Sequence, residues 1–91
     1  VQFHTAVCLA RDGQILETCD TTTVHFRVLD TDEIARYVAA EQPLDCAGSF
    51  KCEGLGISLF TAIDNQDPSA LIGLPLIATC QLLRQAGYRL P

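Results

Sequence analysis

Apolar and polar residues alternate with period two over residues 1–10, and again over much of residues 15–29. This period is typical of a β-strand whose two faces meet different surroundings. Between the two segments lies Asp12-Gly13, a dipeptide that two-residue hairpin turns favour because both central residues need a positive φ. The pattern predicts a long antiparallel hairpin. Its second strand should carry one apolar face that includes Val24, Phe26 and Val28.

A helix is predicted after the hairpin, over residues 31–42. Asp30 precedes Glu33 by the spacing of a capping box, in which the first side chain binds the backbone N–H of the second residue. Pro43 should stop the helix because it disfavours helical backbone in the residue before it. We expect one apolar face, formed by Ile34, Tyr37 and Val38.

The sequence of the second half of the chain predicts a loop, a strand and a helix. Residues 44–56 contain three glycines without a clean period, residues 57–63 alternate again, and residues 64–68 carry turn chemistry. A final helix should open near Pro75 and end at Gly87. Its apolar face is expected to be Leu76, Cys80 and Leu83. The order ββαβα predicts a layered α/β fold.

Charge and length exclude some partners. The 91 residues carry six Lys and Arg against eleven Asp and Glu, a formal net charge of -5, with no basic stripe for a nucleic-acid duplex. No stretch approaches the about 20 apolar residues of a membrane span, and no leader pattern opens the chain. We expect a soluble cytoplasmic protein with no membrane partner. Because a strand pattern begins at Val1, we expect a piece of a longer polypeptide.

The five cysteines are odd in number and never spaced C-x-x-C. This pattern favours neither a disulfide framework nor a zinc knuckle. We expect them to be mostly buried small apolar residues.

The most informative loop carries Lys51, the one lysine of the chain, two residues from Glu53 and close to Ser49. A lysine and a carboxylate beside exposed backbone N–H groups can hold a phosphate oxygen and the hydrogen-bonding edge of a base. The order of residues is not that of a P-loop, because Lys51 precedes Gly54. The alternative is a surface loop in which both charges are solvated.

Other candidate sites are weaker. Cys46 with His25 would make a thiol nucleophile and its base, but no family-specific context surrounds either residue. Both histidines fall on predicted strands, where a satisfied hydrogen bond or solvent is the ordinary explanation. Asp64 and Asp67 bracket a turn and lack the further oxygen ligands that Ca²⁺ requires.

A family resemblance covers essentially all 91 residues, in order and without large gaps. The segments PLDCAGSFKCEGLG (43–56) and LIGLPL (71–76) closely resemble the Maf family of nucleoside triphosphate pyrophosphatases. The segments VHFRVLDTDEIARYV, CAGSFKCEG and IGLPLIA resemble the branch of that family that prefers 7-methyl-GTP.

The resemblance implies an inosine-triphosphatase-like layered α/β fold with a mixed sheet and a long hairpin. It also implies hydrolysis of the bond between the α- and β-phosphates of 7-methyl-GTP or a similar modified nucleotide, with a divalent metal, Mg or Mn. The products are a nucleoside monophosphate and pyrophosphate. Members of the group are connected with septum formation and cell division.

The resemblance implies roles for four residues of the chain. Glu53 stands where other branches carry the Gln of an I-Q-G sequence, a position linked to choosing the base. A carboxylate suits a cationic methylated guanine because it accepts from the ring's N–H and amino donors and offsets the positive charge. Thr5 stands where the family has a recurrent threonine near the site, and Ser49 and Lys51 are expected to reach phosphate or sugar.

Two family segments are missing from the chain: the S-x-S-P-x-R phosphate-gripping segment, and an Asp-Gln pair whose Asp is taken as the general base. The resemblance therefore implies that residues 1–91 are the C-terminal half of one Maf-like domain. Since charge stabilisation and a placed nucleophile are both needed, we expect the chain alone to be inactive. The rival interpretation is a non-catalytic interaction module that forms a homodimer through strand edges.

Overall fold

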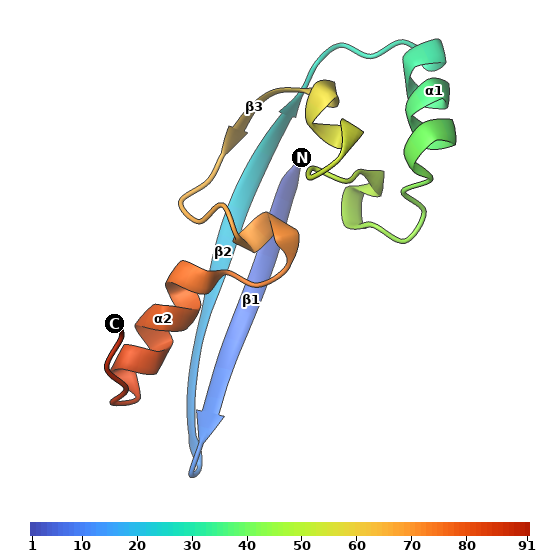
Figure 1. The fold of residues 1–91 in the computed structure, drawn as a ribbon. Helices are drawn as coiled ribbons and strands as arrows, with labels where there is room; N and C mark the ends of the chain where they lie inside the picture. Colours follow the sequence, from blue (N-terminus) through green and yellow to red (C-terminus); the bar gives the residue numbers. More distant parts are fainter. The chain divides into compact units, whose positions relative to one another are not determined.

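The computed structural model describes all of residues 1–91. The elements follow the order β1 (Gln2–Arg11), β2 (Gln14–Phe26), α1 (Thr31–Glu41), β3 (Phe60–Asp64) and α2 (Leu76–Gln85), which confirms the predicted order ββαβα (Figure 1). Three short 3-10 helices complete the chain, namely η1 (Ala47–Ser49), η2 (Leu55–Leu59) and η3 (Ala70–Ile72).

The chain divides into two compact units. The hairpin unit contains Gln2–Thr22 and Asn65–Pro91, and the loop unit contains Val1 and Thr23–Asp64. The strand order is β1-β2-β3. The sheet of this chain is antiparallel, because a two-residue turn joins β1 to β2 and β3 runs antiparallel to β2. A mixed sheet, which the resemblance implied, is therefore not what these residues form.

The hairpin follows the prediction closely. Asp12 and Gly13 both have positive φ, at 50° and 79°, as the favoured hairpin turns require. A bond of 3.0 Å between the His4 ring and the Thr21 hydroxyl fits the pairing that this turn sets, and it satisfies the histidine. The same pairing places Cys8 opposite Glu17 and Ala6 opposite Cys19. One face of β1 is half-buried, at Phe3, Thr5, Val7 and Leu9, and the residues between them are exposed.

The cysteine prediction is wrong. Cys8 and Cys19 are exposed, while Cys46, Cys52 and Cys80 are only half-buried, and all five are free thiols. The reason on the hairpin is the period of two, because both cysteines occupy the outward positions of their strands.

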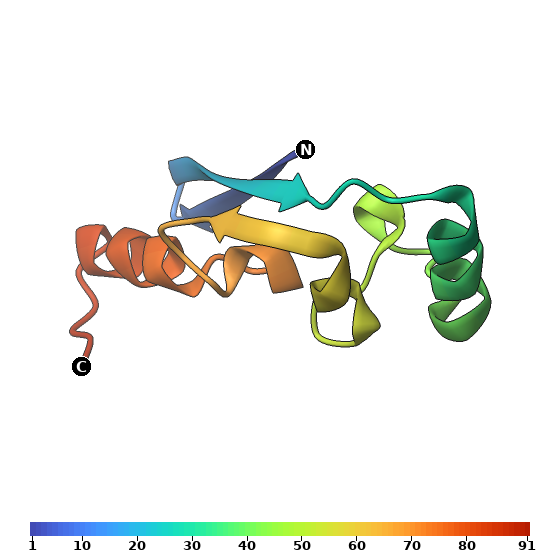
Figure 2. The same cartoon turned by 90° about the horizontal axis from the view of Figure 1, so that it is seen from above.

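Helix α2 packs in the hairpin unit, where it and η3 contact β1 and lie on one side of the hairpin (Figure 2). Its buried residue is Leu82, which is 4% exposed. The predicted face was misplaced by about one residue, since Cys80 and Leu83 are half-buried and Leu76 is 51% exposed. The predicted stop is confirmed, because Gly87 follows the helix with a φ of 101°.

The N-terminus of α2 is capped by a residue for which the sequence predicted no capping role. Pro75 occupies the cap position and has no side-chain acceptor. Asp67, which is 3% exposed, accepts instead from the backbone N–H of Ile77 at 2.8 Å and from that of Ser69 at 3.0 Å. The Ser69 hydroxyl donates to the same carboxylate and accepts from the N–H of Leu76 at 2.8 Å. Two helix N–H groups without intrahelical partners are thereby satisfied.

The loop unit is built around an aromatic cluster. Val24 and Leu59 are buried, and Phe26, Phe50 and Phe60 meet edge to face with ring centroids 4.8 to 5.9 Å apart. Such pairs add to the free energy gained from burying their surface. His25 faces away from this core and pairs with Asp64 at 2.7 Å.

Helix α1 starts and ends where the sequence predicts. Asp30 accepts from the N–H of Glu33 at 2.7 Å, and Gln42 closes the helix with a left-handed backbone before Pro43. The predicted apolar face is only partly buried, because Tyr37 is 8% exposed but Ile34 is 49% exposed.

Both strand boundaries in this unit differ from the prediction. β2 ends at Phe26, where a register shift interrupts pairing with β3, and Val28 is 98% exposed. The backbone N–H of Arg27 still donates to the Leu59 carbonyl at 2.8 Å, and its side chain binds the Ser58 carbonyl and the Glu33 carboxylate. β3 begins only at Phe60, because the residues before it close into η2.

No helix has the length and apolar character to cross a bilayer.

The Asp67 cap generates a stability prediction. Removing its carboxylate in Asp67→Ala leaves helix N–H groups unpaired, so we expect the melting temperature at pH 7 to fall by about 5 °C. The exposed neighbour Gln66→Ala should melt like the parent chain. Both are measured by circular dichroism.

The same cap predicts a pH dependence. The Ser69 hydroxyl, followed by the N–H groups of Ile77 and Ser69, lowers the pKa of Asp67 against the opposing effect of burial. A lowered folded pKa stabilises the fold above the pKa of the unfolded chain, and this stability is lost as the pH falls through the folded pKa. The difference in melting temperature between the parent chain and Asp67→Ala should therefore shrink below about pH 4. A difference that is constant with pH would contradict this role.

Candidate functional site

The candidate site is a tight turn of the loop unit that presents Glu53. The Lys51 carbonyl accepts from the N–H of Gly54 at 3.2 Å and from that of Gly56 at 3.0 Å, so the backbone reverses within a few residues. Cys52 and Glu53 lie between these anchors. We call residues 51–56 the acidic turn.

Two glycines make this path accessible. A Cβ at Gly56 would overlap the carbonyl of Lys51, and a Cβ at Gly54 would overlap the carboxylate of Glu41. Neither residue needs a positive φ, so the requirement here is space rather than backbone freedom. These two glycines therefore allow the turn to pack closely on itself and on α1.

Helix α1 holds the acidic turn from one side. The hydroxyl of Tyr37 accepts from the backbone N–H of Lys51 at 2.7 Å. One helical turn later, the carboxylate of Glu41 accepts from the N–H of Leu55. Helix α1 contacts η2, and this contact brings these side chains to the loop.

The Glu53 carboxylate is exposed and ionised at neutral pH. Its own backbone N–H and the Cys52 thiol lower the pKa of Glu53 below its ordinary value, against the opposing effect of burial, and the Lys51 charge adds a smaller lowering. The thiol donates to the carboxylate over 3.4 Å. The side chain therefore offers acceptor oxygens and a full negative charge.

The structure brings three of the four predicted site residues into one loop. Ser49, Lys51 and Glu53 are close in sequence; Ser49 is exposed, has a left-handed φ of 59° and donates its N–H to the Cys46 carbonyl. Lys51 is half-buried. Thr5 belongs to the hairpin unit, where its hydroxyl donates to the Ala70 carbonyl at 3.3 Å.

The thiol alternative finds no support in the geometry. Burial, then the charge of Asp45 and the hydrogen bond to it, raise the pKa of Cys46, whereas a nucleophilic cysteine needs a lowered pKa. Cys46 donates to Asp45, and His25 pairs with Asp64. The two residues therefore have other partners and do not form a thiol and base pair.

No group of three or more His, Cys, Asp or Glu side chains is arranged to hold a metal ion. The chain's own side chains thus do not fit a complete metal site, and the divalent metal implied by the resemblance stays a prediction. Asp67, which sequence analysis weighed as a cation ligand, is engaged by the backbone of α2.

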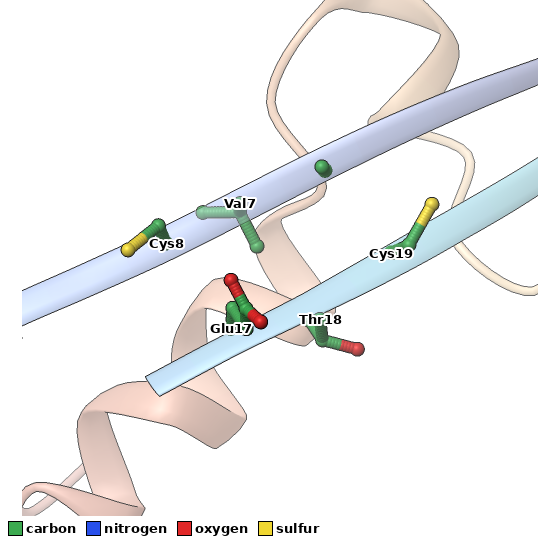
Figure 3. A pocket seen from close by; sticks show the side chains of 6 residues that line it. Val7, Cys8, Glu17, Thr18 and Cys19 are labelled. Atoms are coloured by element: carbon green, nitrogen blue, oxygen red, sulfur yellow. The ribbon is translucent and has the colours of Figure 1, made fainter. Parts of the chain in front are cut away.

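A hollow of about 400 Å³ lies on the hairpin (Figure 3). Its lining residues are Ala6, Val7, Cys8, Glu17, Thr18 and Cys19. Cys8 and Cys19 come from neighbouring strands, and Glu17 is the one charged residue among them. This hollow offers no cationic group for a phosphate, so it does not compete with the acidic turn as a nucleotide site.

Tyr37 and Glu41 contribute to the site in ways that the sequence did not predict. The pattern of apolar residues placed Tyr37 on an apolar face and indicated no role for Glu41. Their spacing of four residues on one helix face, directly before a glycine-containing loop, was the available signal.

The comparisons with known proteins agree on one family. The family model described as Maf-like protein matches residues 1–86. A relative from Xanthomonas oryzae pv. oryzae (strain MAFF 311018), named 7-methyl-GTP pyrophosphatase, is 62% identical over 91 residues, which are 100% of this chain and 48% of that protein. Relatives of the same name from Saccharophagus degradans and Vibrio cholerae are 52% and 53% identical, with 98% and 96% of this chain covered and 46% of each relative.

The chain spans about half the length of the curated relatives it matches. The family match covers nearly all of its residues, including the acidic turn and the segment that leads into α2. On this evidence the chain belongs to the Maf family.

Proposed function

We propose that the chain supplies the base-selecting part of a nucleotide pyrophosphatase that acts on 7-methyl-GTP or a similar modified nucleotide. The observation that carries the proposal is the ionised, exposed carboxylate of Glu53 on a turn fixed by its own backbone and by α1. Membership of the Maf family and the name of the relatives, 7-methyl-GTP pyrophosphatase, support a nucleotide substrate of this class.

The chemistry of the base explains the choice of residue. A guanine edge presents N–H and amino donors, and methylation at the seventh ring position adds a positive charge. A carboxylate accepts from both donors and cannot itself donate, whereas an amide mixes one acceptor with one donor group. The charge-assisted bonds of Glu53 should therefore favour the methylated base over the neutral one.

The reaction itself needs groups beyond those of the chain. In the proposed reaction a water oxygen forms a bond to the α-phosphorus, and the bond from that phosphorus to the bridging oxygen breaks, which releases pyrophosphate and leaves the monophosphate. Lys51 and Ser49 are proposed to contact phosphate or sugar, and Thr5 to contribute from β1. The general base is proposed to lie in a complementary N-terminal half of the same domain.

A second candidate function, a non-catalytic module that forms a homodimer, is favoured by one observation. Strand β1 lies at the edge of the strand order, and an unpaired edge can accept another strand. Light scattering on the purified chain tests it: a monomer at micromolar concentration contradicts the module, and a concentration-independent dimer supports it.

The first prediction of the leading proposal concerns selectivity. We define the completed protein as this chain joined to the complementary half of the Xanthomonas oryzae relative. In it, Glu53→Ala should reduce the preference for 7-methyl-GTP over GTP, measured as the ratio of the two kcat/KM values, by about tenfold or more. Glu53→Gln should lose most of the same preference, because it keeps an acceptor but not the charge.

Asp45→Asn is the matched control, since it removes an equal charge from the same loop, and it should leave the ratio within about twofold of the unmodified value. An unchanged ratio in Glu53→Ala would show that another residue selects the base.

The second prediction concerns the chain alone. Purified residues 1–91, incubated with 7-methyl-GTP and either Mg²⁺ or Mn²⁺, should release no pyrophosphate above the rate without protein, because no general base is expected in this half. The completed protein serves as the positive control and should lose its activity when the metal is chelated. Robust turnover by the chain alone would overturn the assignment of the general base to the other half.

A further inference from the structure

Helix α1 places two polar side chains one helical turn apart, and both bind backbone groups of the acidic turn rather than solvent. Tyr37 and Glu41 are four residues apart, the spacing at which helical side chains lie on the same face. Their acceptor atoms meet the N–H groups of Lys51 and Leu55, one on each side of Glu53.

The Tyr37 contact is well protected. The side chain is 8% exposed, and the distance from its hydroxyl oxygen to the Lys51 nitrogen is 2.7 Å. A buried N–H that lost this acceptor would be unsatisfied, so the contact fixes the backbone where the turn begins.

The Glu41 contact fixes the other end. Its carboxylate accepts from the N–H of Leu55 and lies directly against Gly54, where an added Cβ would force the Glu41 side chain to shift. A charged acceptor makes a stronger bond to an N–H than a neutral acceptor does.

Between the two anchors, the hydrogen bonds of the Glu53 carboxylate are local. They join it to its own N–H and to the neighbouring Cys52 thiol. Those bonds move with the turn, so they orient the carboxylate only relative to the turn. The two α1 side chains tie the turn to the helix.

We propose that Tyr37 and Glu41 are positioning residues that set the base selectivity of the site by clamping the acidic turn; this rests on the function proposed for Glu53. Neither residue touches the nucleotide. They act by holding the Glu53 carboxylate at one place, so that the base meets it without an entropic cost for ordering the turn.

The test begins with the clamp itself, measured in the chain without nucleotide. Tyr37→Phe removes the acceptor of Lys51, and Glu41→Ala removes that of Leu55, so amide hydrogen exchange at the matching residue should accelerate by about tenfold or more. Glu41→Gln keeps a carbonyl acceptor and should restore most of the protection. Asp32→Ala, which removes a carboxylate from the first turn of the same helix, should not affect either amide.

Selectivity is then measured in the completed protein. Tyr37→Phe and Glu41→Ala should each lower the ratio of kcat/KM values for 7-methyl-GTP and GTP by about threefold to tenfold, whereas Asp32→Ala should leave both the ratio and kcat for GTP within about twofold of the unmodified values. Glu41→Gln should restore most of the ratio. In a Glu53→Ala background neither clamp substitution should change the ratio further, because both act through that carboxylate.

The outcomes separate the inference from the proposed function. If Glu53→Ala abolishes selectivity while the clamp variants speed exchange and leave the ratio unchanged, the inference is wrong and the proposed function stands. If Glu53→Ala leaves the ratio unchanged, the proposed function fails, and the inference fails with it. Unchanged exchange in Tyr37→Phe and Glu41→Ala would show that α1 does not clamp the turn, which overturns the inference directly.

Discussion

The close approach of the acidic turn to helix α1 is the constraint on which the candidate site depends. A Cβ at position 56 would collide with the backbone carbonyl of Lys51, and a Cβ at position 54 would force the Glu41 side chain to shift. Glycine at both positions therefore lets the N–H groups of residues 54 and 56 reach the Lys51 carbonyl while Leu55 reaches α1. The exposed position of Glu53 follows from that path, because the residue lies in the part of the turn that faces neither anchor.

Apart from Glu53, which binds its own N–H, carboxylates bind backbone N–H groups at three places in this acidic chain. Asp30 caps α1, Asp67 caps α2, and Glu41 holds η2. In each case the negative charge meets N–H groups that have no carbonyl partner in a helix or sheet. A net charge of -5 therefore does not mean a uniformly repulsive surface, since part of it is matched to the positive ends of the backbone's own dipoles.

The features that the sequence predicted are those determined by near neighbours. Asp12-Gly13 encodes its turn, Asp30 caps a helix three residues away, and Gly87 ends one that precedes it directly. The features it did not predict depend on partners farther along the chain. Asp67 reaches Ile77 over ten residues, and the hydroxyl of Tyr37 meets a backbone group fourteen residues later. A residue's type and spacing do not reveal such bonds, because they require the loop between the partners to fold first.

The misplaced start of β3 has a different cause, because local bonds compete there with strand pairing. Residues 57–63 do alternate, but the Ser58 hydroxyl binds the Leu55 carbonyl and the Gly56 N–H binds the Lys51 carbonyl, so these bonds took the first residues of the predicted strand. Ser49, Lys51 and Glu53 could be singled out from the sequence of their loop, and Thr5 from the family resemblance. The Tyr37 and Glu41 contacts that hold the acidic turn could be found only from the folded structure.

The exposure of Glu53 also bears on how the proposed site discriminates. An attraction between a carboxylate and a cationic base is weak in water and grows when solvent is excluded from both. An exposed carboxylate on one fixed turn therefore supplies a negative charge in a defined orientation. A large preference for the methylated base requires a second surface that covers the base. Under the proposed function, that surface belongs to the complementary half. Because the acidic turn is already held by α1, covering the base would strengthen the bonds to a carboxylate that is already in position.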